Sequence, residues 1–136
     1  MNTEAAHTAA LLATAREALE RYLDVRIDDD GALTFRHAGV PCAVQAMQLV
    51  EGLSVLTLSC VVAWDLPDDP ELAASVARRA GSDLFGTLGV VPSPSGLDVT
   101  LRYTFPAEGL DPAALGTLLM LVVSAASRAR ADLVGA

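Results

Sequence analysis

The sequence predicts an α+β fold in the order α-β-β-β-β-α-β-β-α, with helices packed against a twisted antiparallel sheet. Apolar residues recur at helical spacing near both ends of the chain, whereas much of the middle alternates with a period of two. Two Asp-Pro pairs mark helix starts, since aspartate can cap a helix and proline suits its first position. The 136 residues fit a single domain, which we expect to span residues 1–136.

Residues 4–23 predict an amphipathic helix. One face is apolar and is expected to join the core; its residues are Leu12, Ala15, Leu19, Tyr22 and Leu23. The opposite face carries two pairs of opposite charge, each one turn apart, namely Arg16 with Glu20 and Glu17 with Arg21. The helix is therefore expected to bury one side and to expose the other.

After this helix the period changes to two. Four β-prone runs, at 25–27, 32–37, 42–49 and 53–64, are separated by turn signals, of which Asp30-Gly31 is the strongest hairpin signal. They predict an antiparallel meander. In the fourth run we expect Leu56 and the alternate residues up to Trp64 to face the core. The other face is mildly polar and consists of Val55, Thr57, Ser59, Val61 and Ala63.

A second helix and two more strands follow the meander. Asp69-Pro70 predicts a helix over about 70–80, and residues 84–91 and 97–105 predict the strands. In the second of these strands, apolar residues from Leu97 to Phe105 alternate with polar ones, so that one face is buried and the other exposed.

Asp111-Pro112 predicts the last helix. The uncharged run up to Arg128 is about 16 residues long, shorter than the roughly 20 that a bilayer-spanning helix needs, so we expect a soluble helix packed on the sheet. Met120 and Leu121 flank its polar strip. Its core face is expected to contain Leu115, Leu118, Leu119, Val122, Ala126 and Leu133.

Charge and cysteine content restrict the partners and the compartment. The net charge is −8 and the chain has no lysine, so binding to nucleic acid or to an anionic membrane is not expected. The N-terminus lacks the basic and apolar regions of a signal peptide. Cys42 and Cys60 lie in strand-like runs and are interpreted as buried thiols of a cytoplasmic protein, with a cross-strand disulfide as the alternative.

No catalytic motif is evident, so no enzyme activity, cofactor or metal is expected. His7 and His37 are the only histidines, and neither has a partner at metal-ligand spacing. Three aspartates before Gly31 predict a solvated turn, because a calcium loop requires acids at alternate positions. A minor hydrolase that depends on Cys60 or His37 stays as an alternative.

The composition favours a binding role. Apolar residues make up 52% of the chain and charged ones 19%, which leaves more apolar surface than a small monomer easily buries. We therefore expect a self-association surface or a groove for a protein or peptide partner. Val55 and Val61 on the outer sheet face, Trp64 at a strand end, and Met120 and Leu121 on the last helix are the candidate contacts. The alternatives are that Trp64 closes the core, and that a small apolar ligand binds between sheet and last helix.

Four segments in this element order carry a family resemblance: "DDDGALTFRHAGVPCAVQ", "DLPDDPEL", "LFGTLGV" and "GLDPAAL". From about residue 8 to 133 the chain resembles the YbjN-type proteins of actinobacteria, which are grouped with type III secretion chaperones. The resemblance implies a small α+β fold with helices against a twisted antiparallel sheet, frequent homodimers, the binding of extended client segments, and a sensory-regulator description without a known reaction. Together with the composition, it leads us to expect a non-enzymatic, chaperone-like or adaptor protein that binds a protein or peptide client as a homodimer. Family members often carry asparagine near the end of the middle helix, where this chain has Ala80 and Gly81.

Overall fold

The structure, a computed structural model, describes residues 3–135 and has the predicted element order. The helices are α1 (Thr3–Glu20), α2 (Pro70–Arg79) and α3 (Pro112–Val134). The strands are β1 (Arg26–Ile27), β2 (Leu33–His37), β3 (Val40–Val50), β4 (Leu53–Leu66), β5 (Thr87–Ser93) and β6 (Gly96–Pro106). The α+β prediction is confirmed.

The strands form one antiparallel sheet in the order β1-β2-β3-β4-β6-β5. The first four strands are the predicted meander. The chain then leaves the sheet through α2 and returns at the edge as β5, so that β6 fills the place between β4 and β5. β5 begins at Thr87, later than predicted, and Leu84 before it is exposed.

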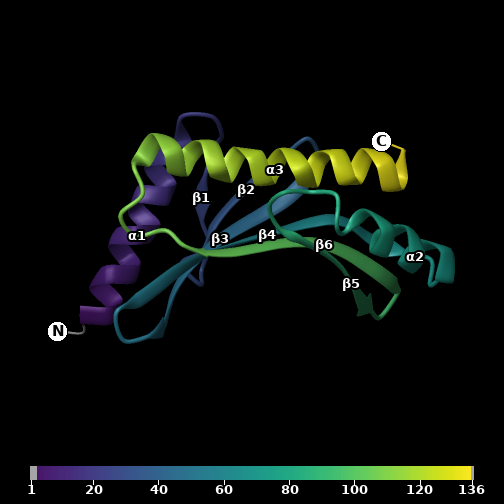
Figure 1. Cartoon of the computed structure of the whole chain (residues 1–136), viewed down its shortest axis with the longest axis horizontal. Helices are drawn as coiled ribbons and strands as arrows, with labels where there is room; N and C mark the ends of the chain where they lie inside the picture. Colours follow the sequence, from purple (N-terminus) through teal and green to yellow (C-terminus); the bar gives the residue numbers. More distant parts are fainter. Residues whose placement is uncertain (1–2, 136) are drawn as a thin grey trace.

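The helices lie on one side of this sheet. Figure 1 shows α3 running along the sheet, with α1 beside its start and α2 near its end. Arg79 of α2 forms an ion pair with Asp132 of α3, which joins these two helices. No helix within residues 3–135 covers the opposite side, which we call the open sheet face.

The core lies between α3 and the sheet. Leu56, Leu58, Cys60 and Val62 of β4 are fully buried, as are Leu115, Leu119 and Val122 of α3. Burial of this apolar area is the main force that holds the layers together. With 23 residues, α3 is long and apolar enough to cross a membrane by length and composition. The sequence-based argument that this segment is too short to span a bilayer is therefore too strict. It is the packing of α3 on the sheet that makes it a core helix.

Two helix starts that look alike in the sequence differ in the structure. The Asp69 side chain accepts a hydrogen bond from the backbone N–H of Glu71 at 3.0 Å, so the predicted cap of α2 is confirmed. Asp111 makes no such bond, and the prediction of a second side-chain cap is wrong.

Tyr22 is exposed rather than in the core, because α1 ends at Glu20 and Tyr22 no longer follows the helical spacing.

Three of the predicted side-chain positions in β4 are wrong, two of them because the strand is irregular. The pairing with β6 shifts between Val61 and Ala63, which places Ala63 beside buried Val99 and takes Trp64 out of the core pattern. Ala63 is therefore buried, and Trp64 is 41% exposed. Val55 is only 3% exposed, although it was expected on an accessible face. It lies opposite Met47 on one neighbouring strand and Pro106 on the other, and these two residues flank it.

Candidate functional site: the open sheet face

One row of residues crosses the open sheet face through all six strands. Directly paired residues of antiparallel strands project to the same face, so the pairings can be followed from strand to strand. The row that results is Arg26, Thr34, Ala43, Ser59, Arg102 and Thr87. In this row Arg26 and Arg102 lie towards opposite edges of the sheet, and the residues between them have small side chains.

Two hollows lie along this row. The larger has a volume of about 650 Å³ and is lined in part by Arg26, Arg36, Ala43 and Val61. The second, of about 480 Å³, is lined in part by Gln45, Met47, Thr57, Arg102 and Thr104. Ser59 borders both, so the two hollows adjoin over the middle of the sheet, and we call them together the trough. The Thr57 and Thr104 hydroxyl oxygens lie 2.9 Å apart and hydrogen-bond to each other across the strands.

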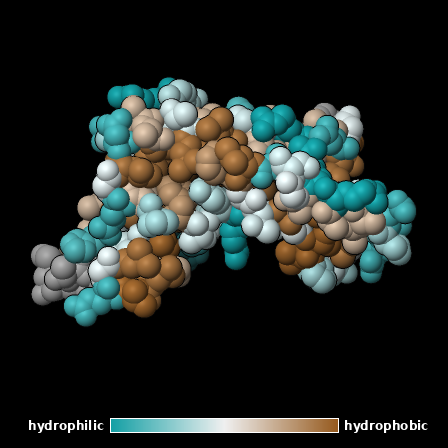
Figure 2. All heavy atoms as spheres, in the orientation of Figure 1, coloured by the Kyte–Doolittle hydropathy of each residue, from teal (hydrophilic) through white to brown (hydrophobic). Residues whose placement is uncertain are grey.

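The trough ends at an apolar hairpin. Met47, Leu49, Val50 and Leu53, at the tip of the β3–β4 hairpin, are between 39% and 63% exposed, and we call them the hairpin-tip patch. Figure 2 shows apolar surface over this hairpin, at the lower left of the view. Contiguous apolar surface of this kind is typical of a contact site for another molecule.

A second apolar surface lies on α3. Leu121 is 51% exposed, and with Leu84 and Phe85 it borders a small hollow of about 130 Å³ with Asp83 and Arg128 at its rim. We call Leu84, Phe85 and Leu121 the α3 flank patch. Met120 is partly buried and packs against the core.

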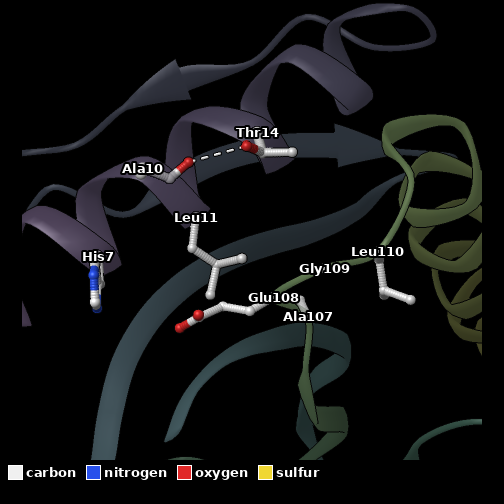
Figure 3. Close-up of a pocket in the computed structure, with 8 residues that line it drawn as sticks. All are labelled: His7, Ala10, Leu11, Thr14, Ala107, Glu108, Gly109 and Leu110. Atoms are coloured by element: carbon white, nitrogen blue, oxygen red, sulfur yellow. Dashed lines mark hydrogen bonds between the residues drawn. The ribbon is translucent and has the colours of Figure 1, made fainter. Parts of the chain in front are cut away.

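A fourth hollow, of about 240 Å³, separates α1 from the loop between β6 and α3. In Figure 3 the Leu11 side chain on α1 and Glu108 on the loop extend towards each other, with His7 and Leu110 at the sides. His7 and Glu108 form no hydrogen bond or ion pair with each other. Within residues 3–135 no group of three or more His, Cys, Asp or Glu residues could hold a metal ion.

The two cysteines lie side by side in the core. Cys42 and Cys60 are paired across β3 and β4, both are buried free thiols, and their sulfur atoms are 3.4 Å apart. A disulfide bond is about 2.05 Å long, so the structure has the thiols rather than the bridge. The hydrogen bond between the two thiols raises the pKa of Cys60 far above its usual range, and burial adds to the effect. Because the thiolate is the nucleophile, this environment does not favour catalysis by Cys60.

Thiol reactivity tests this arrangement. We expect both thiols to react with an aromatic disulfide reagent at least about 100-fold faster in denaturant than in the folded protein, because labelling requires opening of the core. Two thiols should titrate in denaturant without reductant. Rapid labelling of the native protein would contradict the burial, and no labelling in denaturant would indicate a disulfide.

The structure separates the residues that the sequence singled out. Val61 borders the trough and Leu121 belongs to the α3 flank patch, whereas Val55 is buried. Trp64 stacks against Arg130, whose guanidinium carbon lies 5.1 Å from the ring centroid. Arg130 also donates a hydrogen bond to the carbonyl oxygen of Val62 at 2.9 Å, so Trp64 is held at the end of β4.

Sequence reasoning missed the arginines of the trough and the hairpin-tip patch. Arg36 and Arg102 alternate with core residues of their strands, which places them on the open face. That signal was present in the sequence. Their alignment with Arg26, however, depends on the register of the sheet.

The described residues thus form an open six-stranded antiparallel sheet with helices on one side and an uncovered trough on the other. The chain belongs to the YbjN family, described as "Putative bacterial sensory transduction regulator", whose profile matches residues 8–134. No curated protein matches the chain.

Two solved structures are similar to it in fold. A chain in the crystal structure of the ExsC–ExsE complex is 20% identical, with a TM-score of 0.62 over 98% of this chain and 97% of that one. The crystal structure of YbjN from E. coli, described as a putative transcription regulator, is 14% identical, with a TM-score of 0.54 over 87% and 92%. At 20% and 14% identity, these two likenesses show the fold of the chain.

Proposed function

We propose that this protein is a non-enzymatic, chaperone-like adaptor that binds a client polypeptide on its open sheet face and acts as a homodimer. The observation that carries the proposal is the uncovered trough, which crosses the sheet and continues into the hairpin-tip patch. A trough floored by strands and ended by exposed apolar side chains suits an extended peptide, whose side chains can occupy successive hollows.

The remaining parts of the proposal concern its context. The protein acts as a single domain over residues 1–136 in the cytoplasm, and it contacts neither nucleic acid nor membrane. The net charge of −8 supports the last point, that nucleic acid and membrane are not contacted, because phosphate-rich surfaces repel such a molecule. The second copy contacts the α3 flank patch, which leaves the open sheet face to the client. An actinobacterial source stays a prediction.

A pair of leucine variants tests client binding. Affinity purification of the tagged protein from its native host, with identification of what co-elutes, should recover a discrete polypeptide with the wild type. Leu49→Ser should lower the recovery at least about tenfold, because it removes an apolar anchor from the hairpin-tip patch.

Leu110→Ser is the matched control. Leu110 is also an exposed leucine, but it borders the hollow beside α1 rather than the trough. It should bind the client as the wild type does. Recovery of no polypeptide by the wild type, or equal loss in both variants, would contradict client binding through the hairpin.

A further inference from the structure

The arginines of the open sheet face have no partners. Arg26, Arg36 and Arg102 are exposed, and none forms a hydrogen bond or an ion pair with any residue in the range 3–135. By contrast, Arg16 pairs with Glu20 and Arg79 with Asp132. In a chain with 17 acidic residues, three unpaired guanidinium groups on one face are a local concentration of positive charge.

Few acidic groups near the trough compensate for them. Asp24 borders the larger hollow and is not paired with either of the arginines there. Asp98 lies on the same face of β6, but it accepts a hydrogen bond from the backbone N–H of Asp65 at 3.0 Å and holds that turn. Among the described residues that line the second hollow, Arg102 is the only charged one. The trough is therefore a positively charged strip on an acidic molecule.

The spacing of the arginines suits an extended chain. Arg26 on β1 and Arg102 on β6 are separated by four strand spacings, or roughly 19 Å along the sheet. An extended peptide advances roughly 3.3 Å per residue, so about six residues bridge this distance. Between the two arginines, Ala43 and Ser59 have small side chains that let a second backbone approach the sheet.

From these observations we propose that the client segment is acidic and extended, and that it crosses the strands along this row. One carboxylate pairs with Arg102, and a second, about six residues away, pairs with Arg26 or Arg36. Guanidinium groups bind carboxylates through two parallel hydrogen bonds, which fixes the position of the segment along the trough. The inference rests on the proposed client binding and specifies which chemistry that client presents.

Two synthetic peptides test the inference. One is a ten-residue peptide of alternating leucine and threonine with glutamate at two positions six residues apart, and the other has glutamine at both positions. In fluorescence anisotropy the glutamate peptide should bind at least about tenfold more tightly, and added salt should weaken its binding because the charged groups are exposed.

Arginine variants locate the contact. Arg26→Gln and Arg102→Gln should each lower the affinity for the glutamate peptide about tenfold and leave that for the glutamine peptide unchanged. Arg21→Gln is the matched control, because Arg21 is also exposed and unpaired but follows α1, away from the trough. Unchanged melting temperatures would show that all three variants fold.

Several results would overturn the inference. Equal binding of the two peptides, or no binding of either, would exclude an acidic client segment. In both cases the proposed function would still be supported if the wild type captured a client and Leu49→Ser did not. Conversion of a dimer to a monomer by Arg102→Gln would assign the trough to a second copy. Tighter binding of a single-stranded oligonucleotide than of the glutamate peptide would assign it to nucleic acid.

Discussion

A Gly96→Ala variant is expected to lose more than about 3 kcal/mol of its free energy of unfolding, or not to fold, because a side chain there collides with the backbone. Gly96 opens β6 with a φ of +149°, which residues with a side chain rarely adopt. A Cβ atom would lie 2.1 Å from the carbonyl oxygen of Leu66, the last residue of β4. The paired ends of β4 and β6 would therefore have to separate.

Urea unfolding followed by circular dichroism measures the loss, and Gly31→Ala is the matched control. Gly31 also has a positive φ, +85°, but a Cβ there would have no atom within 4 Å. Its substitution should cost only the backbone strain, about 1–2 kcal/mol. Equal losses in the two variants would contradict a clash at Gly96.

The element order could be predicted because alternation and turn residues are local properties. The strict alternation from Leu97 to Phe105 became β6, and Asp30-Gly31 became the turn between β1 and β2. The cap at Asp69 follows from three neighbouring residues and needs no information from the rest of the chain. Signals that depend only on neighbouring residues can be interpreted without knowledge of the tertiary structure.

Breaks in that alternation could not be predicted. Residues 61–64, "VVAW", are all apolar, so the sequence does not mark where the pairing of β4 with β6 shifts. A second shift, between Ala63 and Leu66, contains Asp65, which adopts a φ of +55° and is held by Ser95 and Asp98 from distant parts of the chain. The predicted core position of Trp64 was wrong for this reason.

The candidate site was predicted even less well, because its parts come together only through the register. Arg26 and Arg102 are far apart in the sequence, and neither lies in a recognisable motif. Composition indicated surplus apolar surface. Of the five residues predicted to carry it, Val55 is buried whereas Trp64 and Leu121 are exposed, and none of the five belongs to the hairpin-tip patch. A reader of the sequence alone sees scattered arginines, whereas the sheet aligns them.

A Leu119→Ala variant is expected to lose about 2–5 kcal/mol of its free energy of unfolding at every protein concentration. Leu119 is fully buried in the core between α3 and the sheet, so truncation leaves a cavity that the neighbouring helix and strands can close only in part. Leu121, two residues further along the helix, is the matched position because it points away from that core.

Leu121→Asp should behave differently, because its effect depends on association. At low protein concentration it should change the free energy of unfolding by less than about 0.5 kcal/mol, as is usual for an exposed residue. At high concentration the wild type should gain stability through dimerisation, and Leu121→Asp should not, because a carboxylate in the α3 flank patch disfavours burial against a second copy. Light scattering at both concentrations gives the masses.

The two variants together separate the core from the proposed interface. A wild type that is monomeric at both concentrations would refute the homodimer, and a dimer that survives Leu121→Asp would exclude the α3 flank patch as its contact. Similar losses for Leu119→Ala and Leu121→Asp at low concentration would mean that α3 is rotated relative to the sheet. If Leu119→Ala alone causes a large loss, one face of α3 is buried in the core. If the stability of the wild type depends on concentration and Leu121→Asp abolishes that dependence, the other face of α3 contacts a second copy.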